Sequence, residues 1–254
     1  MAGFVAPAAP DRRHRPTHRS ALPVSLGRHR LRQCRPCHAL LCTADRTVVF
    51  FDVMDTIVRD PFFRGMHRHF GFNSFDDFIA AKHPHTWVEW ESGAVDESQL
   101  AQRFFRQASE LPPRLAPLCR FDGDAFRQYL LQQYAFVDAG MEALLAELHR
   151  QPHLELHLFS NYPPYYRLIE QRLQLSRYLR WTAISCETGL RKPALEAYWD
   201  AARRAHCPLD GCILIDDRQC NVDAALQAGF RDAIHFGGGS GDLRRALHEH
   251  GLLK

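Results

Sequence analysis

Hydrophobic residues form two kinds of pattern along this chain, short continuous runs and helical stripes. From residue 140 onward the two alternate regularly. Short β-branched and aromatic runs predict strands, and stripes such as Leu144, Leu145 and Leu148 predict helices. The predicted strands cover 47–53, 154–159, 181–186, 212–215 and 233–236, and the helices 141–150, 165–173, 194–204, 221–227 and a short segment at the end. This alternation predicts a parallel sheet covered by helices on both faces.

The segment between the first two predicted strands has a different pattern. It is polar, aromatic and acidic, with helical stretches at 75–82, 97–109 and 124–134 that a proline-rich break at 111–117 divides. Because it contains no predicted strand, we expect it to form a helical cap at about residues 62–138. The expected fold is therefore α/β, a Rossmann-like parallel sheet core within residues 47–254 with an inserted helical cap.

Polar side chains follow the predicted strands at the points where these end. Asp52 closes the first strand, Ser160 follows the second, and Asp216 and Asp217 follow the fourth. Ligand sites of parallel α/β sheets form outside the carboxyl ends of the strands. We therefore expect these four residues, which are distant in sequence, to meet at one edge of the sheet.

The basic charge of the chain is concentrated at its amino-terminal end. Of 32 basic and 29 acidic residues, nine Arg and two Asp fall within residues 1–46, which leaves 23 basic and 27 acidic residues in the remainder. An Arg-rich, acid-poor leader is typical of plastid and mitochondrial transit peptides. We predict a transit peptide over residues 1–46 and a location in the plastid stroma, with the mitochondrion as the alternative.

The charge pattern also limits the expected partners. The remainder after residue 46 carries a net charge of −4, which argues against nucleic acid as the main partner. No run of about 20 apolar residues is present, so we expect no membrane span. The oligomeric state is open.

Four motifs at these junctions together resemble the haloacid dehalogenase (HAD)-like hydrolase superfamily. They are Asp-Val-Met-Asp-Thr at 52–56, Ser-Asn at 160–161, Gly-Leu-Arg-Lys-Pro at 189–193, and Asp-Asp followed by Asn at 216–221. They occur in the family's order, and the resemblance covers residues 47 to about 236. It implies the HAD fold and catalysis by the first aspartate.

The chemistry of these residues is consistent with that implication. The carboxylate of Asp52 can attack phosphorus and form an aspartyl-phosphate, which divides a difficult hydrolysis into two steps. Mg²⁺ prefers oxygen ligands and would bridge Asp52, Asp217 and a phosphate oxygen. Lys192 would neutralise charge on Asp52 and the phosphoryl group, while Ser160 donates a hydrogen bond to that group.

The remaining site residues are assigned from the resemblance and from residue type. The resemblance adds the backbone carbonyl of Met54 as a metal ligand, and we expect Asp216 to belong to the metal site with its neighbour. Asn161 is expected to contact substrate. The cap residues Trp87 and Trp90 are candidates for stacking on an aromatic substrate.

One position departs from the family pattern. In the phosphatases of this family, a second Asp lies two residues after the nucleophile and protonates the leaving oxygen. Here Met54 occupies that position. A positioned general acid contributes about 10²–10⁴ in rate. Three explanations are open: a slow enzyme, a substitute acid such as Asp55 or Asp60 acting through water, or a non-catalytic binding or regulatory protein.

The choice of reaction and substrate depends on two further comparisons within the family. A 2-haloacid dehalogenase is the alternative enzyme, but the acidic pair at 216–217 is a metal-site feature that a dehalogenase does not need. The residues at 51–62, at 82–89 and at 160–163 resemble the flavin mononucleotide (FMN) hydrolases of plant plastids. That resemblance implies Mg²⁺-dependent conversion of FMN to riboflavin and phosphate. Ala194 and Leu195 depart from its usual Asp-Pro.

Overall fold

The computed structural model describes residues 46–253, which belong to one compact unit. The predicted transit peptide, residues 1–46, lies outside the described residues except for Arg46. Among the helices that the structure describes, none is long and apolar enough to cross a membrane.

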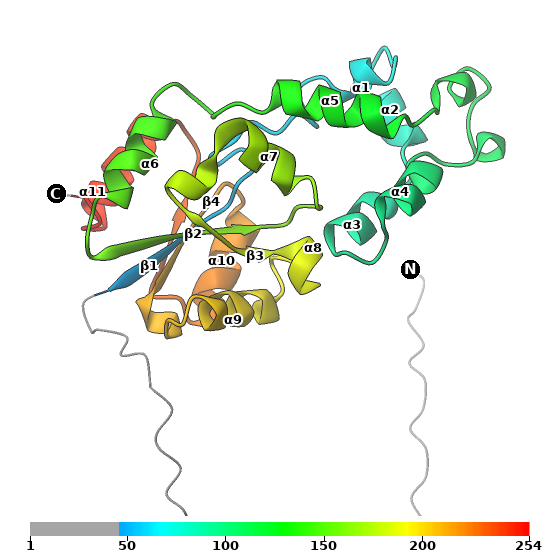
Figure 1. Ribbon diagram of the computed structural model, residues 1–254. Helices are drawn as coiled ribbons and strands as arrows, with labels where there is room; N and C mark the ends of the chain where they lie inside the picture. The colour runs from blue at the N-terminus through cyan, green and yellow to red at the C-terminus, as the bar shows by residue number, and fades with distance from the viewer. Residues whose placement is uncertain (1–45, 254) are drawn as a thin grey trace, which may run out of the picture. The chain divides into compact units, whose positions relative to one another are not determined.

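Five parallel strands form a sheet in the order β3-β2-β1-β4-β5 (Figure 1). Their bounds are β1 Thr47–Phe51, β2 Leu154–Ser160, β3 Arg180–Ile184, β4 Cys212–Asp216 and β5 Asp232–His235. The predicted parallel α/β fold is thereby confirmed. The chain leaves β1 toward β2 and β3 and later returns to β4 on the other side of β1. The boundary between β1 and β4 is thus the switch point at which such sheets bind ligands.

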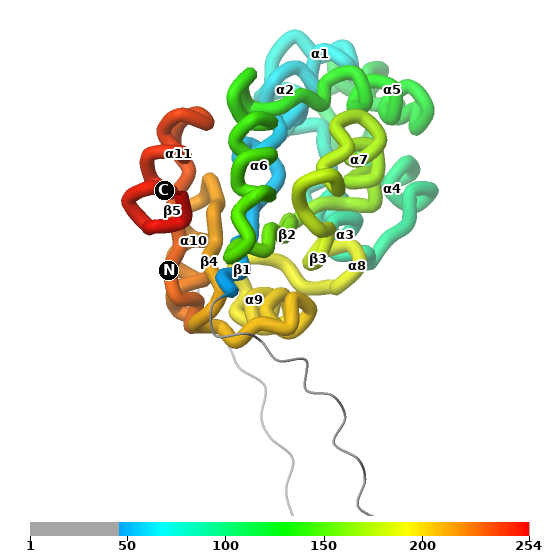
Figure 2. The backbone as a smooth tube through the Cα atoms, turned by 60° about the vertical axis from the view of Figure 1, so that its left-hand side comes forward, coloured from blue at the N-terminus to red at the C-terminus, as the bar shows by residue number. Residues whose placement is uncertain are grey.

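Side chains that alternate along the strands build a separate hydrophobic cluster on each face of the sheet. On β1, Val49 and Phe51 pack into one cluster, and Val48 and Phe50 pack into the other. The first face is covered by α6 Met141–His149, α7 Tyr166–Leu173 and α11 Ser240–Glu249, and the second by α9 Leu195–Arg204 and α10 Gln219–Ala228 (Figures 1 and 2). Gly229 ends α10 with a positive φ of 101°, the C-cap conformation that its type predicts.

Residues 62–138, between β1 and β2, contribute no strand to the sheet and contain five α-helices. They are α1 Met66–His69, α2 Phe75–Ala81, α3 Thr86–Glu91, α4 Glu97–Arg103 and α5 Gly123–Gln133. Ser74, Asp96 and Asp122 cap the amino termini of α2, α4 and α5 with their side chains. Short 3₁₀ helices occur at Ala108–Glu110 and Ala116–Leu118 in this segment, and at Leu175–Arg177 and Leu209–Gly211 after it. We refer to residues 62–138 as the cap.

The structure corrects one prediction within the cap and adds two helices, α1 and α3, that were not predicted. The helix predicted over 97–109 is wrong beyond Arg103, because the backbone at Phe104 and Arg106 bonds to the segment 81–83 instead of continuing the helix. The helix α3 was not predicted, because residues 83–85 before it hold two His and a Pro. A short helix α8, Ser185–Thr188, also follows β3 where the strand was predicted to continue to residue 186.

A buried serine connects the cap to the sheet. The Ser185 hydroxyl donates to the backbone carbonyl of Glu91 in α3 and accepts from the backbone N–H of Tyr162, at 3.0 Å. We expect Ser185→Ala to lower the free energy of unfolding by about 1–3 kcal/mol, because it leaves buried polar groups unpaired. Urea denaturation measures this. Ser109→Ala, on an exposed turn, is the control, and equal midpoints for the two variants would contradict the expectation.

Candidate active site

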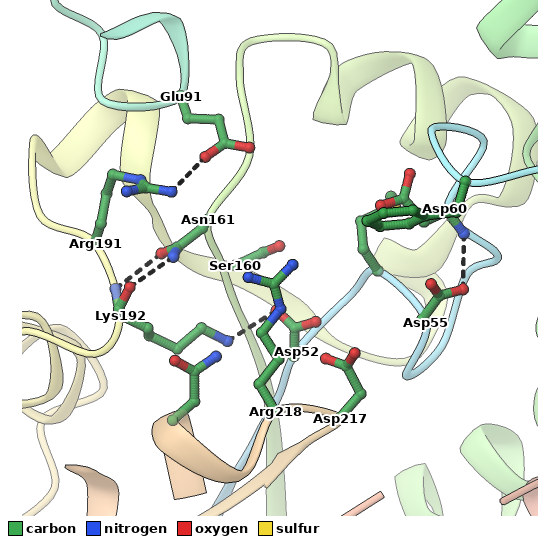
Figure 3. A pocket seen from close by; sticks show the side chains of 13 residues that line it. Asp52, Asp55, Asp60, Glu91, Ser160, Asn161, Arg191, Lys192, Asp217 and Arg218 are labelled. Atoms are coloured by element: carbon green, nitrogen blue, oxygen red, sulfur yellow. Dashed lines mark hydrogen bonds and ion pairs between the residues drawn. The ribbon is translucent and has the colours of Figure 1, made fainter. Parts of the chain in front are cut away.

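The carboxyl ends of β1 and β4 bring three aspartates together. The backbone N–H of Asp52 donates to the carbonyl of Ile215 at 2.8 Å, which places the end of β1 beside the end of β4. One carboxylate oxygen from each of Asp52, Asp216 and Asp217 lies within 4.8 Å of the others. Figure 3 shows Asp52 and Asp217 side by side in the pocket.

Lys192 reaches this group from the loop after α8. Its buried ammonium donates to Asp52 at 2.8 Å, to Asp216 at 2.6 Å and to the carbonyl of Phe159 at 2.7 Å. Burial alone would lower the pKa of Lys192, but the two carboxylates raise it above its usual value, so the side chain is a permanent cation. Its backbone is held by Asn161, whose amide donates to the Lys192 carbonyl at 2.8 Å and accepts from the Lys192 N–H at 2.9 Å (Figure 3).

Asp216 and Asp217 have different surroundings. Asp216 is completely buried, and its oxygens accept hydrogen bonds from Lys192, from the Asn221 amide and from the backbone N–H of Arg218. Asp217 lines the pocket, and no side-chain hydrogen bond of its carboxylate is found among the described residues. Asp217 is therefore the freer of the two carboxylates, and Asp216 chiefly holds Lys192 in place.

The electrostatic balance of the site favours a divalent cation. Burial raises the pKa of Asp52, Lys192 opposes this, and Asp216 adds to the increase. Burial and the neighbouring Asp216 also raise the pKa of Asp217. Three carboxylates face one ammonium, so the fully ionised group carries two uncompensated negative charges. The donor set consists of carboxylate oxygens, which suit Mg²⁺.

Ser160 has a buried polar atom that no other described residue uses, as does Trp90 with its indole N–H. Its side chain is buried, and its hydroxyl has no hydrogen-bond partner among the described residues. Unpaired buried hydroxyls cost free energy, so an orphan of this kind beside a pocket is consistent with a ligand acceptor. Ser160 lines the same pocket as Asp52, Met54 and Lys192, which we call the inner pocket.

A second, outer pocket continues from the inner one toward the cap. Its volume is about 200 Å³ against about 90 Å³ for the inner pocket, so it can accept a larger group. The walls are largely apolar, with polar residues interspersed: Met54, Asp60, Phe62, Phe63, Met66, Lys82, Trp87, Val88, Glu91, Asn161, Tyr162, Arg191 and Arg218. An apolar pocket with a few polar groups is the usual form of a small-molecule site.

The two candidate stacking residues occupy different positions in the structure. Trp87 lines the outer pocket, and its indole N–H donates to Glu91. Trp90 is completely buried, packs edge-on against Trp87 and Tyr165, and lines neither pocket. Trp90 is therefore a packing residue of the cap, and we do not assign it to substrate.

Sequence reasoning missed several residues that line both pockets. Arg191 and Arg218 directly adjoin the motif residues Lys192 and Asp217, and this adjacency is the signal that could have identified them. Glu91 comes from α3 and forms a salt bridge with Arg191 at 2.7 Å (Figure 3). Burial raises the pKa of Glu91, while Arg191 opposes the increase. No sequence pattern marks Glu91, because its partner is a hundred positions away.

Comparison with known proteins places this site in a family. No protein-family model matches the chain. The chain is 38% identical over 182 residues to flavin mononucleotide hydrolase 1 of Arabidopsis thaliana, which is named as chloroplastic. The match covers 72% of this chain and 69% of that protein.

Solved structures of low identity agree in fold. A HAD-like family hydrolase of Porphyromonas gingivalis has a TM-score of 0.59 and 18% identity, covering 80% of this chain and 98% of its own. A HAD family enzyme of Bacteroides thetaiotaomicron, solved with magnesium and inorganic phosphate, has a TM-score of 0.59 and 13% identity, covering 78% and 98%. By its identity to the Arabidopsis enzyme the chain belongs to that enzyme's family of phosphoric monoester hydrolases, and it has the fold of the HAD-like hydrolases.

Proposed function

We propose that this protein hydrolyses FMN to riboflavin and phosphate through an aspartyl-phosphate on Asp52. The observation that carries the proposal is the position of Asp52, which lies between the buried cation Lys192 and the pocket-lining Asp217, with an unpaired serine hydroxyl beside it. A nucleophilic carboxylate needs positive charge beside it to approach an anionic ester, and Lys192 supplies part of that charge.

Asp52, Asp217 and the main chain of Met54 would hold Mg²⁺ in this proposal. When bound, the ion would offset the negative charge of the carboxylates and of the phosphoryl oxygens. Removal of divalent cations with EDTA is accordingly expected to stop turnover, and added MgCl₂ to restore it.

The chain's own residues then divide the work. An oxygen of Asp52 attacks phosphorus while the ester oxygen departs, and Lys192 and Ser160 stabilise the charge on the transferred group. Water then attacks the aspartyl-phosphate and releases phosphate and free Asp52. Asn161 acts by positioning Lys192 through its paired backbone contacts.

The outer pocket supports FMN as the substrate. Its aromatic and aliphatic walls suit a flat, fused ring system, and the edge of such a ring that carries carbonyl and N–H groups can meet arginine donors and a glutamate acceptor. The related Arabidopsis enzyme is named for FMN. Its name also supports the plastid as the location of this chain, in keeping with the Arg-rich composition of residues 1–46.

Phosphate release from a panel of phosphomonoesters tests the proposal. Mg²⁺-dependent release from FMN supports it. Release from another ester but not from FMN would remove the substrate assignment alone. Release of halide from a 2-haloacid would favour a dehalogenase, and no reaction with any compound would favour a non-catalytic protein.

Phe63 offers a test of ring recognition. It lines both pockets yet is 58% exposed, so truncating it costs little stability. We expect Phe63→Ala to raise KM for FMN about 3- to 10-fold, in line with the modest energy of an aromatic contact, while KM for a short alkyl phosphate stays within twofold. Leu226→Ala, an exposed apolar residue of α10, is the control. Equal effects on the two substrates would contradict a role in ring binding.

A further inference from the structure

The departing alcohol of an FMN-type ester needs a proton, and Met54 cannot supply one. Two other carboxyl groups line the inner pocket on the same loop, Asp55 and Asp60. In Figure 3 both lie on the side of the site opposite to Lys192. Their surroundings differ enough to decide between them.

Asp55 is committed to holding the loop. Its Oδ1 accepts from the backbone N–H of Asp60 at 3.0 Å and also from the guanidinium of Arg64. Its backbone has a φ of 52°, in the left-handed region, and its N–H bonds to the carbonyl of Val58. The Asp55 carboxylate thus serves as the acceptor for two donors of its own loop.

Asp60, in contrast, has a carboxylate oxygen that is not used to hold the loop. It lines both pockets and therefore lies at the junction where the inner one ends and the outer one begins. Its Oδ1 accepts from the backbone N–H of Phe62 at 2.8 Å, a turn contact that fixes the side chain, while Oδ2 has no partner among the described residues. An ester whose phosphoryl group occupies the inner pocket and whose alcohol occupies the outer one would place its bridging oxygen at this junction.

The charges around Asp60 favour a proton that can be both given and taken. Burial raises the pKa of Asp60 to about 6, the N–H of Phe62 lowers it, and two carboxylates add to the increase. A carboxyl with a pKa near the working pH suits general acid–base catalysis. The titratable and charged groups that face it are Asp55 on its own loop, Glu91 of α3, Tyr129 of α5, Tyr134, Tyr162 after β2 and Arg218 after β4.

We propose that Asp60 is the general acid and base of this enzyme, acting from a position eight residues after the nucleophile. In the first step the bond from Asp52 to phosphorus forms, the bond to the ester oxygen breaks, and the proton of Asp60 passes to that oxygen, directly or through one water. In the second step Asp60, now a carboxylate, takes a proton from the attacking water as the bond from phosphorus to Asp52 breaks. The inference rests on the proposed phosphatase function.

The dependence on the leaving group tests this assignment. We expect Asp60→Asn to slow phosphoryl transfer from FMN about 10²- to 10⁴-fold, the typical contribution of a general acid. With para-nitrophenyl phosphate, whose leaving group needs no proton, the initial burst of nitrophenol should be retained within about tenfold, followed by slow turnover because the second step lacks its base. Rapid-quench kinetics measures both phases.

Asp55→Asn is the matched control, since asparagine tolerates the left-handed backbone and can still accept from the N–H of Asp60. It should alter both substrates alike. If Asp60→Asn does not fold, as judged by its melting curve, Asp60→Ser serves for the same comparison.

The inference would be overturned if the Asp60 variant lost activity equally with both substrates. It would also be overturned if the Asp55 variant, instead, lost activity with FMN while keeping the burst with para-nitrophenyl phosphate. That failure is separable from failure of the proposed function. In the latter case the wild type would release no phosphate, or the variant Asp52→Asn would still release it.

Discussion

Replacing Asp52 by asparagine is expected to reduce phosphate release by at least about 10⁴-fold. Asparagine has the size of aspartate but no nucleophilic oxygen anion, so no aspartyl-phosphate can form. The fold should survive, because Lys192 keeps its contacts with Asp216 and with the Phe159 carbonyl. Steady-state phosphate release, together with trapping of phosphorylated protein by acid quench, measures the two consequences of the change.

Asp223→Asn is the control for this experiment, since it makes the same chemical change at an exposed position on α10 that lines neither pocket. It should leave activity within twofold of the wild type. Substantial activity in the Asp52 variant, or a phosphorylated residue elsewhere in the chain, would remove Asp52 as the nucleophile.

Replacing Lys192 by methionine is expected to affect both stability and catalysis. Methionine fills much of the same space but leaves Asp52 and Asp216 without their shared cation, and removing one member of a buried ionic group typically costs about 3–5 kcal/mol. Activity should fall at least about 10³-fold, because the charge on the transferred phosphoryl group is no longer compensated. Chemical denaturation and turnover assays measure these effects.

Magnesium provides a second readout for this variant. A divalent cation held by Asp52 and Asp217 would replace part of the missing charge, so MgCl₂ should raise the melting temperature of Lys192→Met more than that of the wild type. Arg203→Met is the control, because its ion pair with Asp200 is on the surface and such pairs contribute about 0–1 kcal/mol. Equal stability losses in the two variants would show that Lys192 is not the electrostatic centre of the site.

The part of the site on the sheet could be predicted from the sequence because the rule behind it is geometric. Parallel strands end at the same edge, so Asp52, Ser160 and Asp217 had to converge once the strands were identified. Lys192 was found through a motif whose residues resemble those of a known family. The strand bounds agree within two residues, and the three central strands β1, β2 and β4 are buried along their whole length.

The part of the site in the cap could not be predicted in the same way. Trp87 and Trp90 are three positions apart on one helix and look alike in sequence, yet one faces a pocket and the other the interior of the cap. Which side of α3 faces substrate depends on where Glu91 and Ser185 connect it to the sheet. Contacts between residues so distant in sequence leave no periodic signal. The contacts that distinguish Asp55 from Asp60 are local, but they leave no periodic signal either.

The adjacent residues Arg191 and Lys192 are directed to different halves of the molecule. Arg191 donates a hydrogen bond to Glu91 of α3 in the cap, whereas Lys192 donates one to Asp52 at the end of β1. Two consecutive side chains thus contact the cap and the end of the sheet. An insertion between them would move one of the two side chains away from its partner, so their adjacency matters as much as their residue types.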